Sequence, residues 1–79
     1  MKKAVTLSYP KNSPAPIITS ITQGDLAERV LKIAADNGII IEEDAELTEV
    51  LSMQDIGAFV PEETWLVLSQ IFAFLTERK

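Results

Sequence analysis

Cysteine and histidine are both absent from the 79 residues of the sequence. Without cysteine the chain can form no disulfide, no thiolate metal site and no thiol nucleophile. Without histidine it lacks the commonest general base and the commonest metal ligand. An enzyme would have to work with carboxylates, lysine, tyrosine, serine or threonine alone. We therefore expect a protein that is not an enzyme and that has no catalytic residue, no metal and no other cofactor.

Positive charge is scarce as well, because seven Lys and Arg stand against twelve Asp and Glu, for a net charge of −5. This balance argues against nucleic acid and against an anionic membrane surface, since both recruit clustered Lys and Arg. The most apolar stretch, residues 65–75, is too short to span a bilayer. The apolar stretch after the basic first three residues is too short for a signal peptide. We expect a cytoplasmic protein with no nucleic-acid partner and no direct membrane insertion.

Three segments have the composition of β-strands, over residues 4–9, 17–22 and 39–42. The first alternates in polarity, with Val5 and Leu7 on one side. Ile39, Ile40 and Ile41 are β-branched on both faces, which is typical of a central strand. A strand, a helix and a further strand in so few residues predict parallel pairing through a right-handed crossover.

Three helices are expected, over residues 25–37, 45–52 and 61–77. Asp25 should cap the first, with Glu28 at the spacing of a capping box, and Gly38 should end it. The first and last helices have apolar faces, formed respectively by Leu26, Val30, Ile33 and Ala34, and by Trp65, Leu68, Phe72 and Leu75.

These elements predict one α/β domain over residues 1–79, in which a small mixed sheet of three strands packs with three helices. A chain of this size has a free energy of unfolding of about 4–12 kcal/mol. The whole apolar surface is therefore needed for a single core, and Trp65 and Phe72 are expected inside it.

Two features have both a structural and a functional interpretation. The acidic residues 42–44 and 46 have the charge for a cation site but lack the spacing of a calcium loop, so we expect them to cap the helix at residues 45–52. The strand at residues 4–9 begins near the start of the sequence, so an edge of it could be covered or could accept a strand from elsewhere. The sequence leaves these two alternatives for the edge open.

Several short motifs, in order and at matching spacing, resemble the cytoplasmic domain of the FlhB/YscU family, the substrate-specificity switch proteins of flagellar and other type III export machines. Family patterns A-V-A-L-x-Y, A-P-x-V-V, G-x-L-A, L-A-R-A-L and I-P-E-E-L-Y have counterparts here that begin at Ala4, Ala15, Gly24, Leu47 and Val60. The resemblance covers about residues 4–75.

The family's self-cleavage motif has no counterpart. Relatives cut themselves between Asn and Pro of an N-P-T-H turn just before the first strand, whereas here Met1 and Lys2 fall at the Thr and His. Asn12 is followed by Ser13, so the chemistry is not expected there either. Three further positions differ from the usual family residues in charge or in backbone freedom. Thr22 stands in place of a Gly, Ile21 in place of a Lys and Glu49 in place of an Arg. The chain resembles the C-terminal fragment that cleavage leaves behind, without the transmembrane half of the family.

The resemblance implies a non-catalytic protein-binding module at the cytoplasmic face of a flagellar or related type III export apparatus. Its partners would be export-apparatus proteins or export substrates, with self-association through the first strand as another expectation. The binding residues would lie along the edge of that strand: Ala4, Val5, Thr6, Leu7, Ser8 and Tyr9. The alternative is a diverged cytoplasmic regulator, no longer tied to export, that binds another protein or a small ligand.

Overall fold

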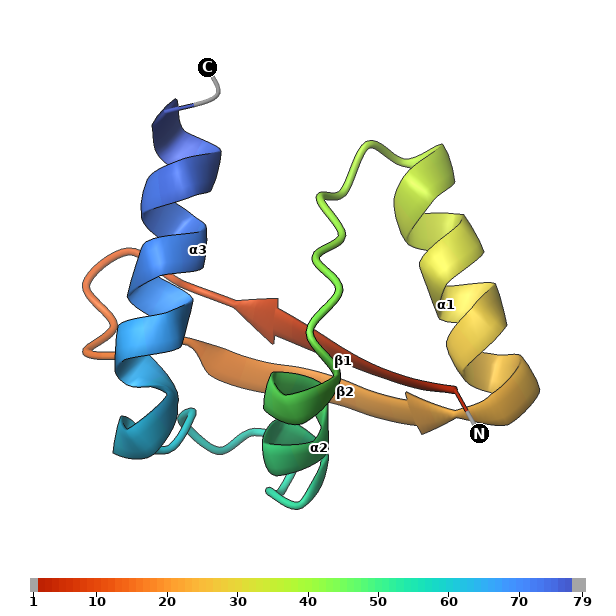
Figure 1. Cartoon of the computed structure of the whole chain (residues 1–79), viewed down its shortest axis with the longest axis horizontal. Helices are drawn as coiled ribbons and strands as arrows, with labels where there is room; N and C mark the ends of the chain where they lie inside the picture. Colours follow the sequence, from red (N-terminus) through yellow and green to blue (C-terminus); the bar gives the residue numbers. More distant parts are fainter. Residues whose placement is uncertain (1, 78–79) are drawn as a thin grey trace.

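The computed structural model describes residues 2–77 of the chain, with side chains for residues 2–73. Two antiparallel strands form the sheet, and three α-helices and one 3-10 turn surround it (Figure 1). Their order is β1 (Lys3–Ser8), β2 (Ile17–Gln23), α1 (Gly24–Asp36), α2 (Ala45–Ser52), η1 (Glu62–Thr64) and α3 (Trp65–Glu77). The expected α/β class is thus confirmed, and the strands and helices that form lie near their expected positions. No helix within residues 2–77 is both long and apolar enough to cross a bilayer.

The two strands pair from Lys3 opposite Gln23 to Ser8 opposite Ile17. The register shifts between Thr6 and Leu7, so that Thr19 is an extra residue of β2 with no Cα partner in β1; its hydroxyl group lies 2.6 Å from that of Thr6. Val5 and Leu7 lie on the same face of the sheet and pack against the core, as their alternation predicted. That core consists of Ala15, Ile18, Leu51, Val60 and Leu68.

Helices lie on both sides of this small sheet. Contacts join α1 to both strands and α2 to β1, while α3 supplies Leu68 to the core. In Figure 1, α1 stands to the right of the sheet and α3 to its left, with α2 below. Such cover is needed, because a hairpin of two strands is at best marginally stable by itself in water.

The outer edge of β2 is covered at its start, around Ile18, by the loop that precedes η1. Ile18 donates its backbone N–H to the carbonyl of Ala58 at 3.0 Å and accepts one from Gly57 at 2.7 Å. Val60 donates to the carbonyl of Pro16 at 3.0 Å. Gly57 adopts a φ of 93°, which favours glycine and lets the loop turn back along the strand.

The third strand expected at residues 39–42 does not form, so the predicted parallel pairing and crossover are wrong. Residues 39–44 run from the end of α1 to the start of α2 without joining the sheet. Ile39, Ile40 and Ile41 are 61%, 59% and 41% exposed. Their β-branched side chains favour extended backbone, but a strand also needs a hydrogen-bonded neighbour, and neither of the two described strands pairs with this segment.

The first helix differs from the prediction at its start and on its apolar face. It begins at Gly24 after Gln23, so Asp25 lies within the first turn and is not the cap. Leu26 and Ile33, expected inside, are 55% and 60% exposed. A two-stranded sheet is too narrow to cover the whole apolar face of α1, and the buried residues of this helix are alanines. Its end at Asn37 and Gly38 is confirmed.

The last helix also begins later than expected. Residues 62–64 form a 3-10 turn, and the α-helix starts at Trp65. Trp65 is 44% exposed, so its expected place in the core is wrong; its indole N–H donates to the carbonyl of Val60 at 3.1 Å. Phe72 packs partly buried against the core, while the side chain of Leu75 lies outside the described ones.

We expect Leu68→Ala to lower the free energy of unfolding by about 2–5 kcal/mol, because Leu68 is 4% exposed in the core and the change leaves a cavity. Leu66→Ala is the matched control on the same helix: Leu66 is 70% exposed, and its replacement should change stability by less than about 0.5 kcal/mol. Urea unfolding followed by circular dichroism measures both. Equal losses would contradict the assignment of the core.

Candidate functional site

The second edge of β1 is open. Within residues 2–77, β2 is the one strand that pairs with β1. The carbonyl of Lys2 accepts the N–H of Gly24 at 2.7 Å, and the carbonyl of Ala4 accepts the hydroxyl of Thr22 at 3.3 Å. The backbone groups of Lys2 and Ala4 thus face β2. Because these directions alternate along an antiparallel strand, those of Lys3 and Val5 face the open edge.

Leu7 presents its backbone groups to the same open edge. It lies opposite Ile18, whose own N–H and carbonyl bond to the loop at Ala58 and Gly57 on the far side of β2. Ile18 and Leu7 therefore form a pair without mutual hydrogen bonds. Lys3, Val5 and Leu7 thus direct their backbone N–H and C=O groups away from β2. This spacing of every second residue is the one at which a further strand would form hydrogen bonds.

A cavity of about 770 Å³ lies against this edge of β1. One wall comes from α1 through Val30, Leu31 and Ala34. The opposite wall comes from α2 and α3, and it includes Leu47, Leu51, Leu68, Ile71 and Phe72. Residues 39–45 form the remaining side. Both walls are apolar, so the cavity combines unpaired backbone groups along one side with two hydrophobic faces.

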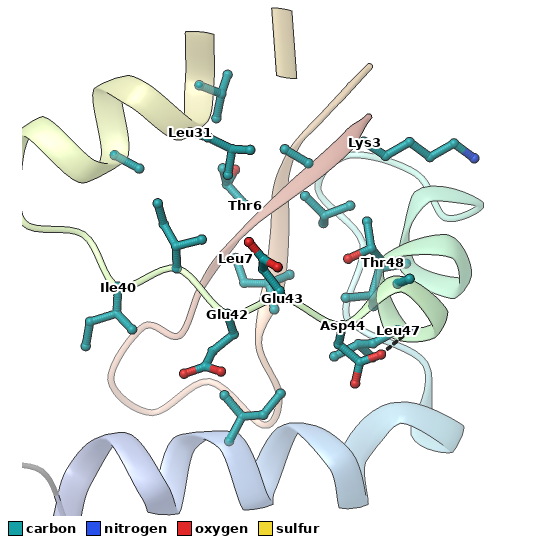
Figure 2. Close-up of a pocket in the computed structure, with 18 of the residues that line it drawn as sticks. Lys3, Thr6, Leu7, Leu31, Ile40, Glu42, Glu43, Asp44, Leu47 and Thr48 are labelled. Carbon is teal, nitrogen blue, oxygen red and sulfur yellow. Dashed lines mark hydrogen bonds between the residues drawn. The ribbon is translucent and has the colours of Figure 1, made fainter. Parts of the chain in front are cut away.

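The segment opposite β1 is held at both ends. At its start, Ile39 donates its N–H to the carbonyl of Ala34 at 2.9 Å, just after Gly38 has ended α1. At its finish, the Oδ1 atom of Asp44 accepts the N–H of Leu47 at 3.0 Å (dashed in Figure 2) and so caps α2. In Figure 1 this green segment descends between α1 and α3 to α2. The hydrogen bonds at its two ends hold this segment in position, while the residues between them pair with no strand.

Negative charge borders the cavity. Four carboxylates and two lysines line it, namely Glu42, Glu43, Asp44, Glu49, Lys2 and Lys3. One lysine is already paired, because the Nζ atom of Lys3 lies 2.8 Å from Oε2 of Glu49. Figure 2 shows Glu42 and Glu43 pointing to opposite sides of the segment, as successive side chains of extended chain do.

The acidic run serves the helix as predicted, through the cap made by Asp44. Across the side chains that the structure describes, no group of three or more acidic residues is placed to hold a metal ion.

Four of the six residues singled out by sequence, Ala4 to Leu7, line the cavity. The other two do not: Ser8 ends β1, and Tyr9 is 55% exposed with its ring 5.8 Å from that of Phe72. Sequence reasoning missed the wall on α1 and the opposite side at residues 39–45. The signal for the latter was present in the three consecutive isoleucines, which were assigned to a strand of the sheet instead.

Comparison with known proteins gives consistent matches. The pattern of the FlhB HrpN YscU SpaS family matches residues 1–75. The uncharacterized protein YlqH of Bacillus subtilis (strain 168) is 29% identical over 76 residues, which cover 95% of this chain and 82% of YlqH. The crystal structure of the PscU C-terminal domain superposes with a TM-score of 0.85 at 23% identity, over 92% of this chain and 95% of that one. At this identity the structural likeness concerns the fold.

We expect Val5→Pro to leave the chain folded, because the N–H that it removes faces the open edge and not β2. Thr6→Pro is the matched change one residue on, where the N–H faces Ser20 of β2. It should cost about 1–3 kcal/mol more than Val5→Pro, since a ladder carbonyl loses its donor. Thermal and urea unfolding by circular dichroism compare the two. Equal destabilisation would contradict the direction assigned to the backbone groups of β1.

We also expect Asp44→Ala to lower the free energy of unfolding by about 0.5–2 kcal/mol, because the first turn of α2 loses its side-chain acceptor. Asp44→Asn retains an oxygen at the same position and should cost much less. Urea titrations of the two variants give the comparison. If both variants lose the same stability, then the charge of Asp44 matters and its capping bond does not.

Proposed function

The chain belongs to the FlhB HrpN YscU SpaS family, and from this premise we propose that it is a non-catalytic protein-binding module associated with a flagellar or other type III protein export apparatus. The fold is that of the C-terminal domain, as the likeness to PscU indicates. A domain of this kind would act in the cytoplasm, at the cytoplasmic face of the apparatus. Its partners would be proteins of the apparatus or the proteins that it exports.

The single observation that carries the binding role is the open edge of β1 beside the cavity. An exposed strand edge recruits extended peptides through backbone hydrogen bonds, a common mode of protein recognition. Val5 and Leu7 hold β1 in register with β2, because a slip of β1 by one residue would turn both away from the core that they contact. In this proposal residues 4–9 are the binding strand.

Self-cleavage is not part of the proposed function. The reaction of the family needs an Asn directly before a Pro, and the sequence contains no such pair. Asn12, which has a φ of 71°, stands in a turn closed by the N–H of Ser13 and the carbonyl of Pro10 at 3.0 Å. This turn connects the two strands and lies outside the cavity lining.

A second candidate function rests on the size of the cavity. At about 770 Å³ it falls within the ~300–1,000 Å³ of pockets that hold small molecules. The chain would then be a diverged cytoplasmic regulator that binds a small ligand or another protein and has no link to export. The open strand edge gives no advantage to a small ligand, and for this reason we place the export-associated module first.

Association with the export apparatus tests the proposal. The tagged chain is mixed with a membrane member of the same family, from the same organism, that has been truncated before its own C-terminal domain. We expect the two to co-purify and the Val5→Pro variant to lose the association. Leu66→Ala, on an exposed position outside the cavity, is the control and should bind like the original chain.

Failure to co-purify with the truncated membrane protein and with the export substrates of that organism would overturn the export assignment. Binding that persists unchanged in the Val5→Pro variant would keep the assignment but remove β1 as the binding strand. Saturable binding of a metabolite that is blocked by changes in the cavity would favour the second candidate.

A further inference from the structure

Asn37 and Gly38 join α1 to the segment at residues 39–44, and this pair has a chemistry of its own. An Asn that precedes Gly cyclises readily, because glycine has no side chain to hinder attack by its backbone nitrogen. We propose that Asn37 is a site of spontaneous succinimide formation, that the fold permits the reaction only while residues 39–44 are detached from α1, and that the products keep this segment detached. The inference does not depend on the proposed function.

The reaction uses the atoms of these two residues and water alone. The backbone nitrogen of Gly38 gives up its proton and bonds to Cγ of Asn37, while the bond from Cγ to Nδ2 breaks and ammonia leaves with that proton. Water then adds to one of the two carbonyl carbons of the imide and breaks its bond to nitrogen. One opening leaves an ordinary aspartate, and the other leaves isoaspartate, in which the main chain runs through the side chain and is longer by a methylene.

The sequence contains two asparagines, and they differ in their readiness to cyclise. Asn37 and Gly38 are both exposed, and the space around the α-carbon of Gly38 is open. Asn12 is followed by Ser13, whose side chain hinders the attack and whose N–H donates to the carbonyl of Pro10 at 3.0 Å. Asn12 is therefore an internal control for Asn37 in the same molecule.

The folded end of α1 holds the reacting atoms apart. The imide ring needs Cβ of Asn37 and the nitrogen of Gly38 on the same side of the Cα–C bond, whereas the ψ of 11° at Asn37 places them well apart. Gly38 donates its N–H to the carbonyl of Ala35 at 3.2 Å, and Nδ2 of Asn37 donates to the carbonyl of Ile33 at 2.7 Å. Rotation about ψ breaks the first bond, and the second restrains the side chain.

The same rotation detaches the segment that follows. Ile39 donates its N–H to the carbonyl of Ala34 at 2.9 Å, and this bond anchors the start of residues 39–44. A change of ψ at Asn37 moves the whole segment relative to α1, as its path away from the end of that helix in Figure 1 makes clear. Cyclisation therefore requires the release of a segment that forms one side of the cavity.

Both products oppose the return of the anchored state. Aspartate in place of Asn37 has no side-chain N–H for the carbonyl of Ile33, and its charge stands at the negative end of the helix dipole, next to Asp36. Isoaspartate also lengthens the chain between the two groups of the anchoring bond, Ala34 and Ile39. The reaction thus converts a transient opening into a lasting one.

Ageing of the full chain at neutral and mildly alkaline pH tests the site. Peptide mapping and enzymatic methylation of isoaspartate locate the product. We expect isoaspartate at Asn37, faster at higher pH because the attacking nitrogen must lose its proton, and about tenfold less at Asn12. Gly38→Ala should slow the reaction about tenfold, although its φ of 72° strains alanine and favours opening. Equal modification of both asparagines, or none at Asn37, would overturn the site.

Two glycine variants test whether local opening controls the rate. Ala35→Gly weakens the exposed last turn of α1 and should accelerate the reaction about three- to fivefold. Gln70→Gly makes a comparable change at an exposed position of α3 and should leave the rate unchanged. Urea unfolding confirms that the two variants lose similar global stability. Equal acceleration would mean that global unfolding controls the reaction, which would overturn the role of residues 39–44.

Hydrogen exchange tests the effect of the products on the anchor. In Asn37→Asp and in the aged protein, the amide of Ile39 should exchange at least about threefold faster than in the fresh chain. Asn12→Asp adds the same charge in a distant turn and should leave Ile39 unchanged. Unchanged exchange in the first two samples would overturn the lasting release. These measurements need no partner, so their outcome is independent of association with the export apparatus.

Discussion

The backbone of β1 is hydrogen-bonded on one side only, and the arrangement of the rest of the chain follows from this constraint. Unpaired N–H and C=O groups away from water are costly, so an open strand edge requires a partner or solvent. Here β2 pairs with β1 along one edge, and the loop around Ala58 covers the start of its other edge. The open side of β1 instead meets a cavity of about 770 Å³ that is lined by residues of α1, α2 and α3.

A core built on two strands has little area, and every helix depends on it. Ile18 is fully buried at the centre, with Leu51, Val60 and Leu68 around it from three different parts of the chain. The first helix contacts the sheet through a strip of small residues and leaves Leu26 and Ile33 in water. An additional strand would widen the sheet beneath α1 and give the apolar surface of that helix more to contact. A partner bound along the open edge of β1 would therefore also raise the stability of the domain.

The family relationship and the structure address different questions. Membership follows from the match over residues 1–75, and the fold follows from the likeness to the PscU domain. Neither identifies the atoms that make contact with a partner. The open edge, the apolar walls and the surrounding carboxylates describe a candidate site in physical terms.

Local chemistry determined where α2 begins and where α1 ends. Asp44 caps α2 and Gly38 ends α1 because a short carboxylate and a positive φ act within a few residues, so the sequence alone predicts them. The α/β class and the inward side of Val5 and Leu7 follow from periodicity in the same way. Whether Ile39 to Ile41 join a sheet, and whether Leu26 is covered, was decided only by the tertiary structure. Both outcomes depend on which distant segment of the chain lies alongside. A pattern of residues indicates that a segment favours pairing or burial, but it does not indicate which segment will be its neighbour.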